Sequence, residues 1–110
     1  MRYVVDIDAT ICTPGESEET RYTGATPIRL RIDTINKLYD EGHQIIYLTA
    51  RGMGRTGNDA VLANQMFYEF TENQLKEWGC KYHKLVLGKP SGDYYIDDKG
   101  INATEFFGDY

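Results

Sequence analysis

The segment Tyr3-Val4-Val5-Asp6-Ile7-Asp8 decides the fold, because it joins a short apolar strand to two carboxylates. Its β-branched residues are typical of a strand that is buried on both faces of a parallel sheet. An Asp inside such a run is costly to bury unless it is paired, bound to a metal or functional. Along an extended chain, Asp6 and Asp8 point to the same side. We therefore expect a first strand here whose carboxyl end carries a site.

Helical and strand patterns alternate along the rest of the chain. Ala9–Thr26 contains one proline, two glycines and a cluster of acidic residues, which predicts an irregular excursion or a small hairpin. Thr26 and Pro27 are typical of a helix N-cap and first helical residue, and apolar residues then recur at helical spacing until Gly42. The later expected elements are a strand over Gln44–Leu48, one kinked helix or two from about Asp59 to Trp78, strands over Leu85–Leu87 and Tyr94–Ile96, and a final turn capped by Asn102.

This alternation predicts an α/β fold in a single domain, 1–110. Right-handed βαβ units would give a minimal Rossmann-like, three-layer fold, with about four parallel strands, helices on both faces and a small flap after the first strand. If Tyr94–Ile96 pairs on the side of the first strand away from Gln44–Leu48, a topological switch point brings Asp97 beside Asp6. The 110 residues exclude a second folded domain.

The amino-acid composition limits the classes of partner and the cellular location that we expect. The formal net charge of -5 disfavours a nucleic-acid partner, since such proteins usually need a basic surface. Cys12 and Cys80 lie far apart without metal-type spacing, which favours free thiols in a reducing cytoplasm. No segment approaches the roughly 20 apolar residues that span a bilayer, so we expect a cytoplasmic protein without a membrane partner. The sequence carries no signal for an oligomeric state.

Acidic residues follow two predicted strands, since Asp97 and Asp98 come directly after Ile96 as Asp6 and Asp8 surround Ile7. Four carboxylates crowded in one cleft repel one another unless a cation binds or some take up protons. Mg²⁺ prefers oxygen ligands and commonly uses one or two carboxylates together with substrate phosphate oxygens. Any single Asp at a strand end also often caps a turn, so the prediction of phosphoryl transfer depends on the set.

Four segments resemble, in order, the motifs of the haloacid dehalogenase (HAD) superfamily of phosphatases. They are Asp6-Ile7-Asp8-Ala9-Thr10-Ile11, Leu48-Thr49-Ala50-Arg51, Gly88-Lys89-Pro90 and Tyr95-Ile96-Asp97-Asp98. The chain is also similar to small capless members associated with capsular or surface polysaccharide synthesis. One departure is Ala9, where many members have Gly, which more easily forms the tight turn that offers N–H groups to phosphate.

The resemblance implies a two-step mechanism through an aspartyl-phosphate. Asp6 would attack phosphorus, and Asp8 would protonate the leaving oxygen and later activate water. Thr49 would hold a phosphate oxygen, and Lys89 would offset negative charge on the transferring group. Taken alone, Thr49 is also an ordinary strand residue and Lys89 an ordinary loop residue.

The resemblance also implies Mg²⁺ as the cofactor. Asp97 would ligate the ion, and Asp98 would ligate it through water or orient its neighbours. The full expected metal set is Asp6, Asp8, Asp97 and Asp98. The residues expected to bind substrate are Thr49, Ala50, Arg51 and Lys89. Arg51 and Arg55 either line the mouth of the site and bind substrate oxygens, or are solvated loop residues.

The intervals between the motifs are too short for a cap domain, so we expect an open site. The leading hypothesis is a Mg²⁺-dependent phosphomonoester hydrolase acting on a sugar phosphate or related phosphorylated metabolite. A phosphotransferase or a nucleic-acid-end phosphatase would use the same motifs. A non-catalytic Mg²⁺- or phosphate-binding regulatory module is a rival of another class. Receiver-type signalling domains are less similar, because their acidic pair and their phosphoacceptor lie on different strands.

Overall fold

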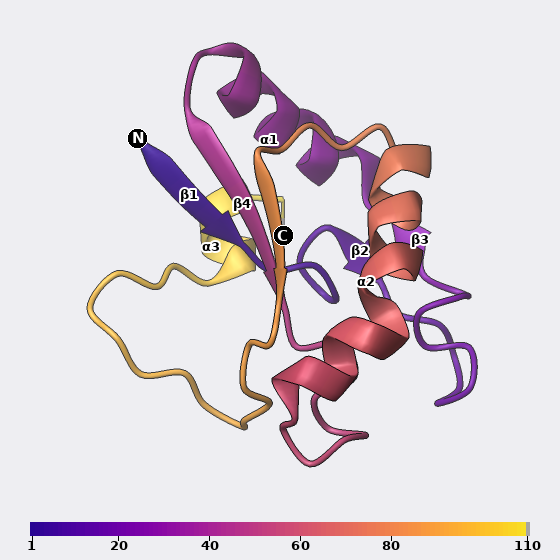
Figure 1. Cartoon of the computed structure of the whole chain (residues 1–110). Coiled ribbons are helices and arrows are strands. Elements are labelled where there is room, and N and C mark those ends of the chain that lie inside the picture. Colours follow the sequence, from indigo (N-terminus) through magenta and orange to yellow (C-terminus); the bar gives the residue numbers. More distant parts are fainter. Residues whose placement is uncertain (110) are drawn as a thin grey trace.

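Three parallel strands form the sheet that carries the site (Figure 1). In this computed structural model, which describes residues 1–109, the strands lie in the order β1-β4-β5. Their bounds are Arg2–Val5 for β1, Gln44–Thr49 for β4 and Lys84–Leu87 for β5. The register pairs Val5 with Tyr47 and Tyr47 with Leu85. The carboxyl ends of all three strands therefore meet at one edge, as the sequence predicted.

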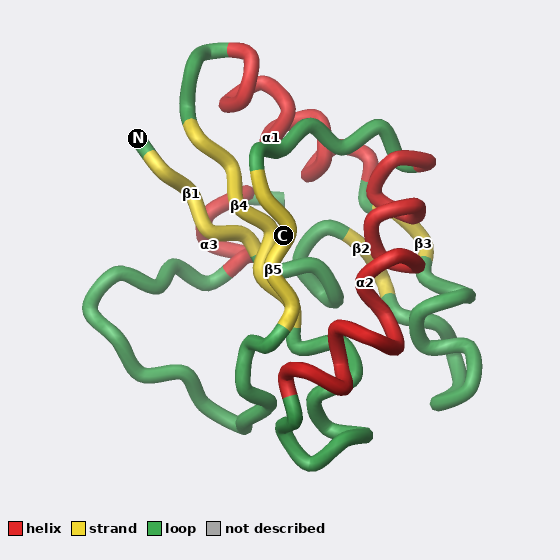
Figure 2. The backbone as a smooth tube through the Cα atoms, viewed as in Figure 1, coloured by secondary structure: helices red, strands yellow, loops and turns green. Residues whose placement is uncertain are grey.

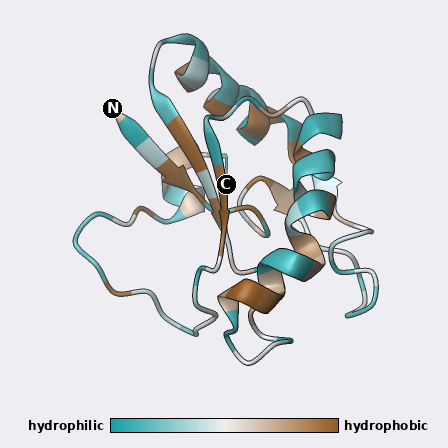
Figure 3. Ribbon diagram, in the orientation of Figure 1, coloured by the Kyte–Doolittle hydropathy of each residue, from teal (hydrophilic) through white to brown (hydrophobic). Residues whose placement is uncertain are grey.

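Two helices, α1 (Arg29–Asp40) and α2 (Ala60–Glu77), cover one face of this sheet. α1 packs against β4 and α2 against β5. Both crossovers step across the sheet in the same direction, and right-handed crossovers then place both helices on the same face. Ile35, Tyr47 and Leu75 belong to the single buried cluster between the layers. Figure 3 shows the apolar residues of β4 and β5 in brown along the middle of the sheet.

The opposite face differs from the predicted three-layer arrangement. Its side chains are half-buried or exposed, and Val4 is 57% exposed. The short helix α3 (Ala103–Phe107) does not cover this face. α3 lies at the β1 edge on the same side as α1: its Phe106 ring centroid is 6.1 Å from that of Tyr3, which packs against the core cluster, and its Phe107 ring contacts α1. Within residues 1–109, no helix packs on this face in the way that α1 and α2 pack on theirs. The described fold is therefore α/β with a helical layer on one face.

The fourth strand predicted over Tyr94–Ile96 is not formed. This stretch lies in the long loop between β5 and α3 (Figure 2), and Ile96 is 96% exposed. Beyond it, one oxygen of Asp97 accepts hydrogen bonds from the backbone N–H groups of Lys99 and Gly100 at 2.6 and 2.7 Å, which makes a local turn. Among the described strands, β1 consequently pairs only with β4, and its outer edge is open.

The excursion after β1 contains the predicted small hairpin, the flap, formed by β2 (Cys12–Thr13) and β3 (Thr26–Pro27). The prediction that Thr26 and Pro27 begin the first helix is wrong. Both residues pair with β2, and the next N–H group, that of Ile28, donates to the carbonyl of Ile11 at 2.8 Å. The chain therefore stays extended until α1 begins at Arg29, without a side-chain cap.

The segment predicted as one kinked helix or two is the single helix α2. Asp59 caps it by accepting a hydrogen bond from the N–H of Leu62, and the chain leaves it through Gly79 at a φ of 70°. Such a left-handed residue after a helix is commonly Gly. Within the described part of the chain, neither α2 nor any other helix is long and apolar enough to cross a membrane.

Candidate active site

A tight turn after β1 sets the positions of the two aspartates that the sequence singled out. The carbonyl of Ile7 accepts hydrogen bonds from the N–H groups of Thr10 and Ile11 at 3.1 and 2.9 Å. Ala9 closes the turn at a φ of 65°, in the left-handed region that favours Gly. Asp6 and Asp8 therefore lie on either side of Ile7, which is fully buried.

Asp6 lies at the carboxyl edge of the sheet between a cation and a hydroxyl. Its Oδ1 is 3.6 Å from Nζ of Lys89, and its Oδ2 accepts a hydrogen bond from Oγ1 of Thr10 at 3.2 Å. Burial raises the pKa of Asp6 above 3.8, and the charge of Lys89 and the hydrogen bonds lower it by less. The carboxylate is nevertheless partly open, with 35% of its side chain exposed.

Thr49 and Lys89 meet where β4 and β5 end. The N–H of Lys89 donates to the carbonyl of Thr49 at 3.2 Å. The Oγ1 of Thr49 is an acceptor for the N–H of Arg51 at 3.1 Å, so its hydroxyl hydrogen remains available to another acceptor. Asn58 holds the loop after Lys89 by accepting from the N–H of Ser91 at 2.9 Å. Asp6, Thr49 and Lys89, which lie far apart in the sequence, are thus gathered at one edge.

Asp8 is held by Arg51 in a two-pronged ion pair. Nε of Arg51 donates to Oδ2 of Asp8 and Nη2 donates to Oδ1, both at 3.0 Å. Arg51 is only 1% exposed. The prediction that Arg51 lines the mouth of the site and binds substrate is therefore wrong for this arrangement. Its guanidinium can point inward because the carboxylate of Asp8 pairs with the charge that would otherwise be buried alone.

Aromatic rings from two other elements enclose this guanidinium. The Cζ atom of Arg51 lies 4.8 Å from the ring centroid of Tyr22 in the flap and 5.9 Å from that of Phe70 in α2. Its Nη1 donates to Oγ1 of Thr71, also in α2, at 3.4 Å. Sequence reasoning missed Tyr22, Phe70 and Thr71, since nothing in their local pattern indicates a shared partner elsewhere in the chain.

Asp97 and Asp98 do not join the other predicted metal ligands. Both are exposed, and Asp97 binds the N–H groups of its own turn, which lower its pKa. Among residues 1–109, no group of three or more His, Cys, Asp or Glu side chains is placed to hold one metal ion. The described arrangement therefore does not fit a complete Mg²⁺ centre.

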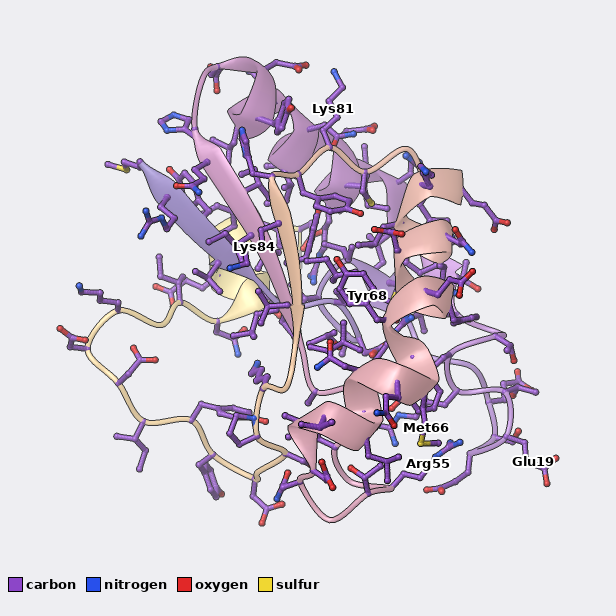
Figure 4. All side chains as sticks on the ribbon, in the orientation of Figure 1. Glu19, Arg55, Met66, Tyr68, Lys81 and Lys84 are labelled. Carbon is purple, nitrogen blue, oxygen red and sulfur yellow. The ribbon has the colours of Figure 1, made fainter. Side chains whose placement is uncertain are left out.

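Arg55 is exposed at the rim of a groove between the flap and α2. Its Cζ lies 5.3 Å from the ring centroid of Phe67, and Figure 4 shows Arg55 and Met66 on the side of α2 that faces Glu19 of the flap. A cavity of about 290 Å³ lies here, lined by Glu18, Glu19, Tyr22, Thr23, Arg55, Met66, Phe67 and Phe70. Of the two arginines considered from the sequence, only Arg55 is placed to meet a ligand from solvent.

The comparisons with known proteins bear on the fold. No protein-family model matches the chain, and no curated protein matches it. Among solved structures, the chain is similar to the crystal structure of a structural genomics target from Vibrio cholerae. The TM-score is 0.84 at 23% sequence identity, and the match covers 96% of this chain and 86% of that one. At this identity the likeness shows a shared fold, an α/β structure with a parallel three-stranded sheet and helices.

Proposed function

We propose that this chain is a HAD-type phosphomonoester hydrolase that forms an aspartyl-phosphate on Asp6. The observation that carries the proposal is the approach of Lys89 to within 3.6 Å of Asp6, beside Thr49, at the edge where the parallel strands end. A nucleophilic carboxylate, a hydroxyl donor and a cation are the groups that phosphoryl transfer requires around one phosphorus atom. Asp8 lies on the same turn as Asp6, which supports its role as the general acid and base.

The chemistry assigns a separate task to each group. An oxygen of Asp6 attacks phosphorus, and the leaving oxygen takes a proton from Asp8 as the bond to phosphorus breaks. Water then attacks the phosphoaspartate and returns a proton to Asp8. Lys89 and the hydroxyl of Thr49 stabilise negative charge on the phosphoryl oxygens. The charge of Lys89 also favours the ionised, nucleophilic form of Asp6.

The charge around the site indicates the class of substrate. The flap beside the site carries the acidic residues Glu16, Glu18 and Glu19, and the whole chain has a net charge of -5. Both features disfavour a polyanionic substrate such as a nucleic acid, because like charges repel. A sugar phosphate or related phosphorylated metabolite fits these charges better.

Mg²⁺ belongs to this proposal only together with a movement of Asp97. The six residues between β5 and Tyr94 can span at most about 20 Å. A fourth strand parallel to β1 at its open outer edge requires crossing three strand spacings, roughly 14 Å, and returning about 10 Å to the strand's amino end, a straight path of about 17 Å. Tyr94–Ile96 can therefore reach this edge and pair there as a fourth strand, which would bring Asp97 toward Asp6. The ion would then be held by oxygen ligands and would offset phosphate charge.

The decisive experiment is a turnover screen with sugar phosphates, nucleotides and p-nitrophenyl phosphate, with and without EDTA. The variant Asp6→Asn should abolish turnover, since an amide cannot form the acyl phosphate. Asp33→Asn is a matched control, because Asp33 is exposed on α1 with only a long contact to Arg29 at 3.9 Å. Equal turnover by Asp6→Asn and wild type would sink the proposed mechanism.

Hydrogen exchange tests the movement separately. If Tyr94–Ile96 pairs with β1, the amides of this stretch and of Val4 should exchange more slowly when Mg²⁺ and phosphate are added. Asp97→Asn should remove that protection without unfolding the chain, because Asp97 is exposed. Unchanged exchange in a protein that turns over substrate would show that the loop does not close in this way.

One observation favours the non-catalytic alternative, a Mg²⁺- or phosphate-binding module. Both oxygens of Asp8 already accept hydrogen bonds from Arg51, and Asp97 accepts hydrogen bonds from the backbone of its own turn. A protein that binds Mg²⁺ and inorganic phosphate in calorimetry, yet turns over none of the screened esters, would establish this reading. Rapid turnover that depends on Asp8 would exclude it.

A further inference from the structure

Arg51 is the most deeply buried charged side chain in the described chain, and the proposed reaction gives it no task. Its side chain has no exposed surface, whereas that of Asp8 keeps 19%. Removing a guanidinium from water is costly unless its donors are satisfied. Here Nε, Nη1 and Nη2 all donate hydrogen bonds, two of them to the single carboxylate of Asp8. The burial is therefore organised around one acidic side chain.

The geometry of the pair fixes the plane of the Asp8 carboxylate. A planar guanidinium that donates two parallel hydrogen bonds to one carboxylate sets its orientation, which a lysine cannot do. Oδ1 of Asp8 is also approached by Sγ of Cys12 at 3.5 Å, whereas Oδ2 has no hydrogen-bond partner but Arg51 within the described residues. Oδ2 is accordingly the oxygen with a free lone pair for exchanging a proton.

The flap holds Arg51 from the other side through Tyr22. The ring of Tyr22 lies over the guanidinium, its hydroxyl accepts a hydrogen bond from the N–H of Gly52 at 3.1 Å, and its carbonyl accepts from Nε2 of Gln74 at 2.8 Å. Phe67 packs edge-on against Tyr22 at 5.1 Å. Hydrogen bonds thus hold Tyr22 both to Gly52, the residue that follows Arg51, and to α2.

We propose that Arg51 is the positioning residue of Asp8 and that Tyr22 of the flap keeps Arg51 in place. This inference rests on the proposed function, because it assigns Arg51 a purpose only if Asp8 moves a proton. In the first step the proton on Oδ2 passes to the leaving oxygen as its bond to phosphorus breaks and the bond from Asp6 forms. In the second step the attacking water returns a proton to Oδ2. Arg51 keeps all of its own protons throughout.

The test uses Arg51→Lys, which keeps the charge but loses the fork, and Arg51→Gln, which keeps a donor but loses the charge. Each should lower kcat for an alkyl phosphate about 10- to 100-fold with little change in KM. The loss should be much smaller for p-nitrophenyl phosphate, whose leaving group needs little protonation.

The Asp8→Asn background separates positioning from general damage to the fold. If Arg51 acts through Asp8, adding Arg51→Lys to Asp8→Asn should cause no further loss of kcat. Tyr22→Leu, which leaves Arg51 and Asp8 intact, should reproduce a weaker form of the Arg51→Lys effect, including its dependence on the leaving group. Equal losses on both esters, or a full further loss in the Asp8→Asn background, would overturn the inference.

A matched control is Asp109→Asn, which breaks another two-pronged pair, with Arg31 at 2.8 Å, at the far end of the chain. It should leave kcat unchanged for both esters. A readout without turnover is the Nε–H proton of Arg51 in nuclear magnetic resonance, which should exchange slowly in wild type and quickly in Asp8→Asn. Asp6→Asn in the same series reports on the proposed function itself, so retained activity there would refute the mechanism and not the Arg51–Asp8 pair.

Discussion

Replacing Ala9 by Gly should stabilise the protein, because Ala9 adopts a φ of 65° in the turn between the two aspartates. A residue with a Cβ pays about 1–2 kcal/mol to occupy the left-handed region. Against this, Gly lowers the stability by about 0.4–1 kcal/mol, because the unfolded chain with Gly has more conformational freedom to lose on folding. The expected net gain in the free energy of unfolding is about 0.5–1 kcal/mol. The turn keeps its hydrogen bond from the N–H of residue 9 to the carbonyl of Cys12.

Urea denaturation measures this gain, and for a chain of this size it corresponds to a rise in Tm of about 2–5 °C. The control is Ala60→Gly at the exposed first residue of α2, where φ is not positive. There Gly should instead cost about 0.5 kcal/mol, since it only loses conformational freedom. If Ala9→Gly is no more stable than wild type, or if both variants shift in the same direction, the strain at Ala9 does not exist.

Three further predictions concern charge, thiols and packing. Burial raises the pKa of Asp6 above 3.8, so the folded state loses stability as the pH rises above that value. In urea denaturation, Asp6→Asn should therefore have a higher free energy of unfolding than wild type at neutral pH and nearly the same one below pH 3.8. An equal difference at both pH values would contradict this. Burial raises the pKa of Cys12 to about 12 and of Cys80 to about 11, so a disulfide reagent at pH 8 should label both slowly until urea unfolds the chain, and fast native labelling would argue against it. Ile32→Ala should lower the free energy of unfolding by about 2–5 kcal/mol with an unchanged m value, because Ile32 is fully buried; a loss below 1 kcal/mol would show that the core closes the cavity.

Elements that depend on local pattern were predictable from the sequence. Apolar runs identified the three strands of the sheet, and Asp59 and Gly79 marked the two ends of α2. The gathering of Asp6, Thr49 and Lys89 at one edge followed from their positions after parallel strands. In each case the determining interactions lie within a few residues, or follow from the geometry common to parallel sheets.

Features that depend on distant partners were not predictable. Tyr94–Ile96 has strand-forming residues, yet β propensity alone does not bring the stretch to the open edge of β1, so no partner strand pairs with it. Pro27 fits a helix start, but the flap uses it in a strand. Arg51 is of a residue type that is mostly exposed, so its burial follows from Asp8, far away in the sequence, and from rings contributed by two other elements.

The central place of β4 in the sheet shapes how the chain gains structure during synthesis. Within residues 1–109, β1 pairs only with β4, and Arg2 and Gln44 are 42 positions apart. At about 5–20 residues per second, the strand that precedes Asp6 waits several seconds on the ribosome without a partner. β5 and Lys89 arrive later still. β1 is therefore made well before the residues that complete its surroundings, and a nascent chain that stops before Lys89 holds Asp6 without its cation.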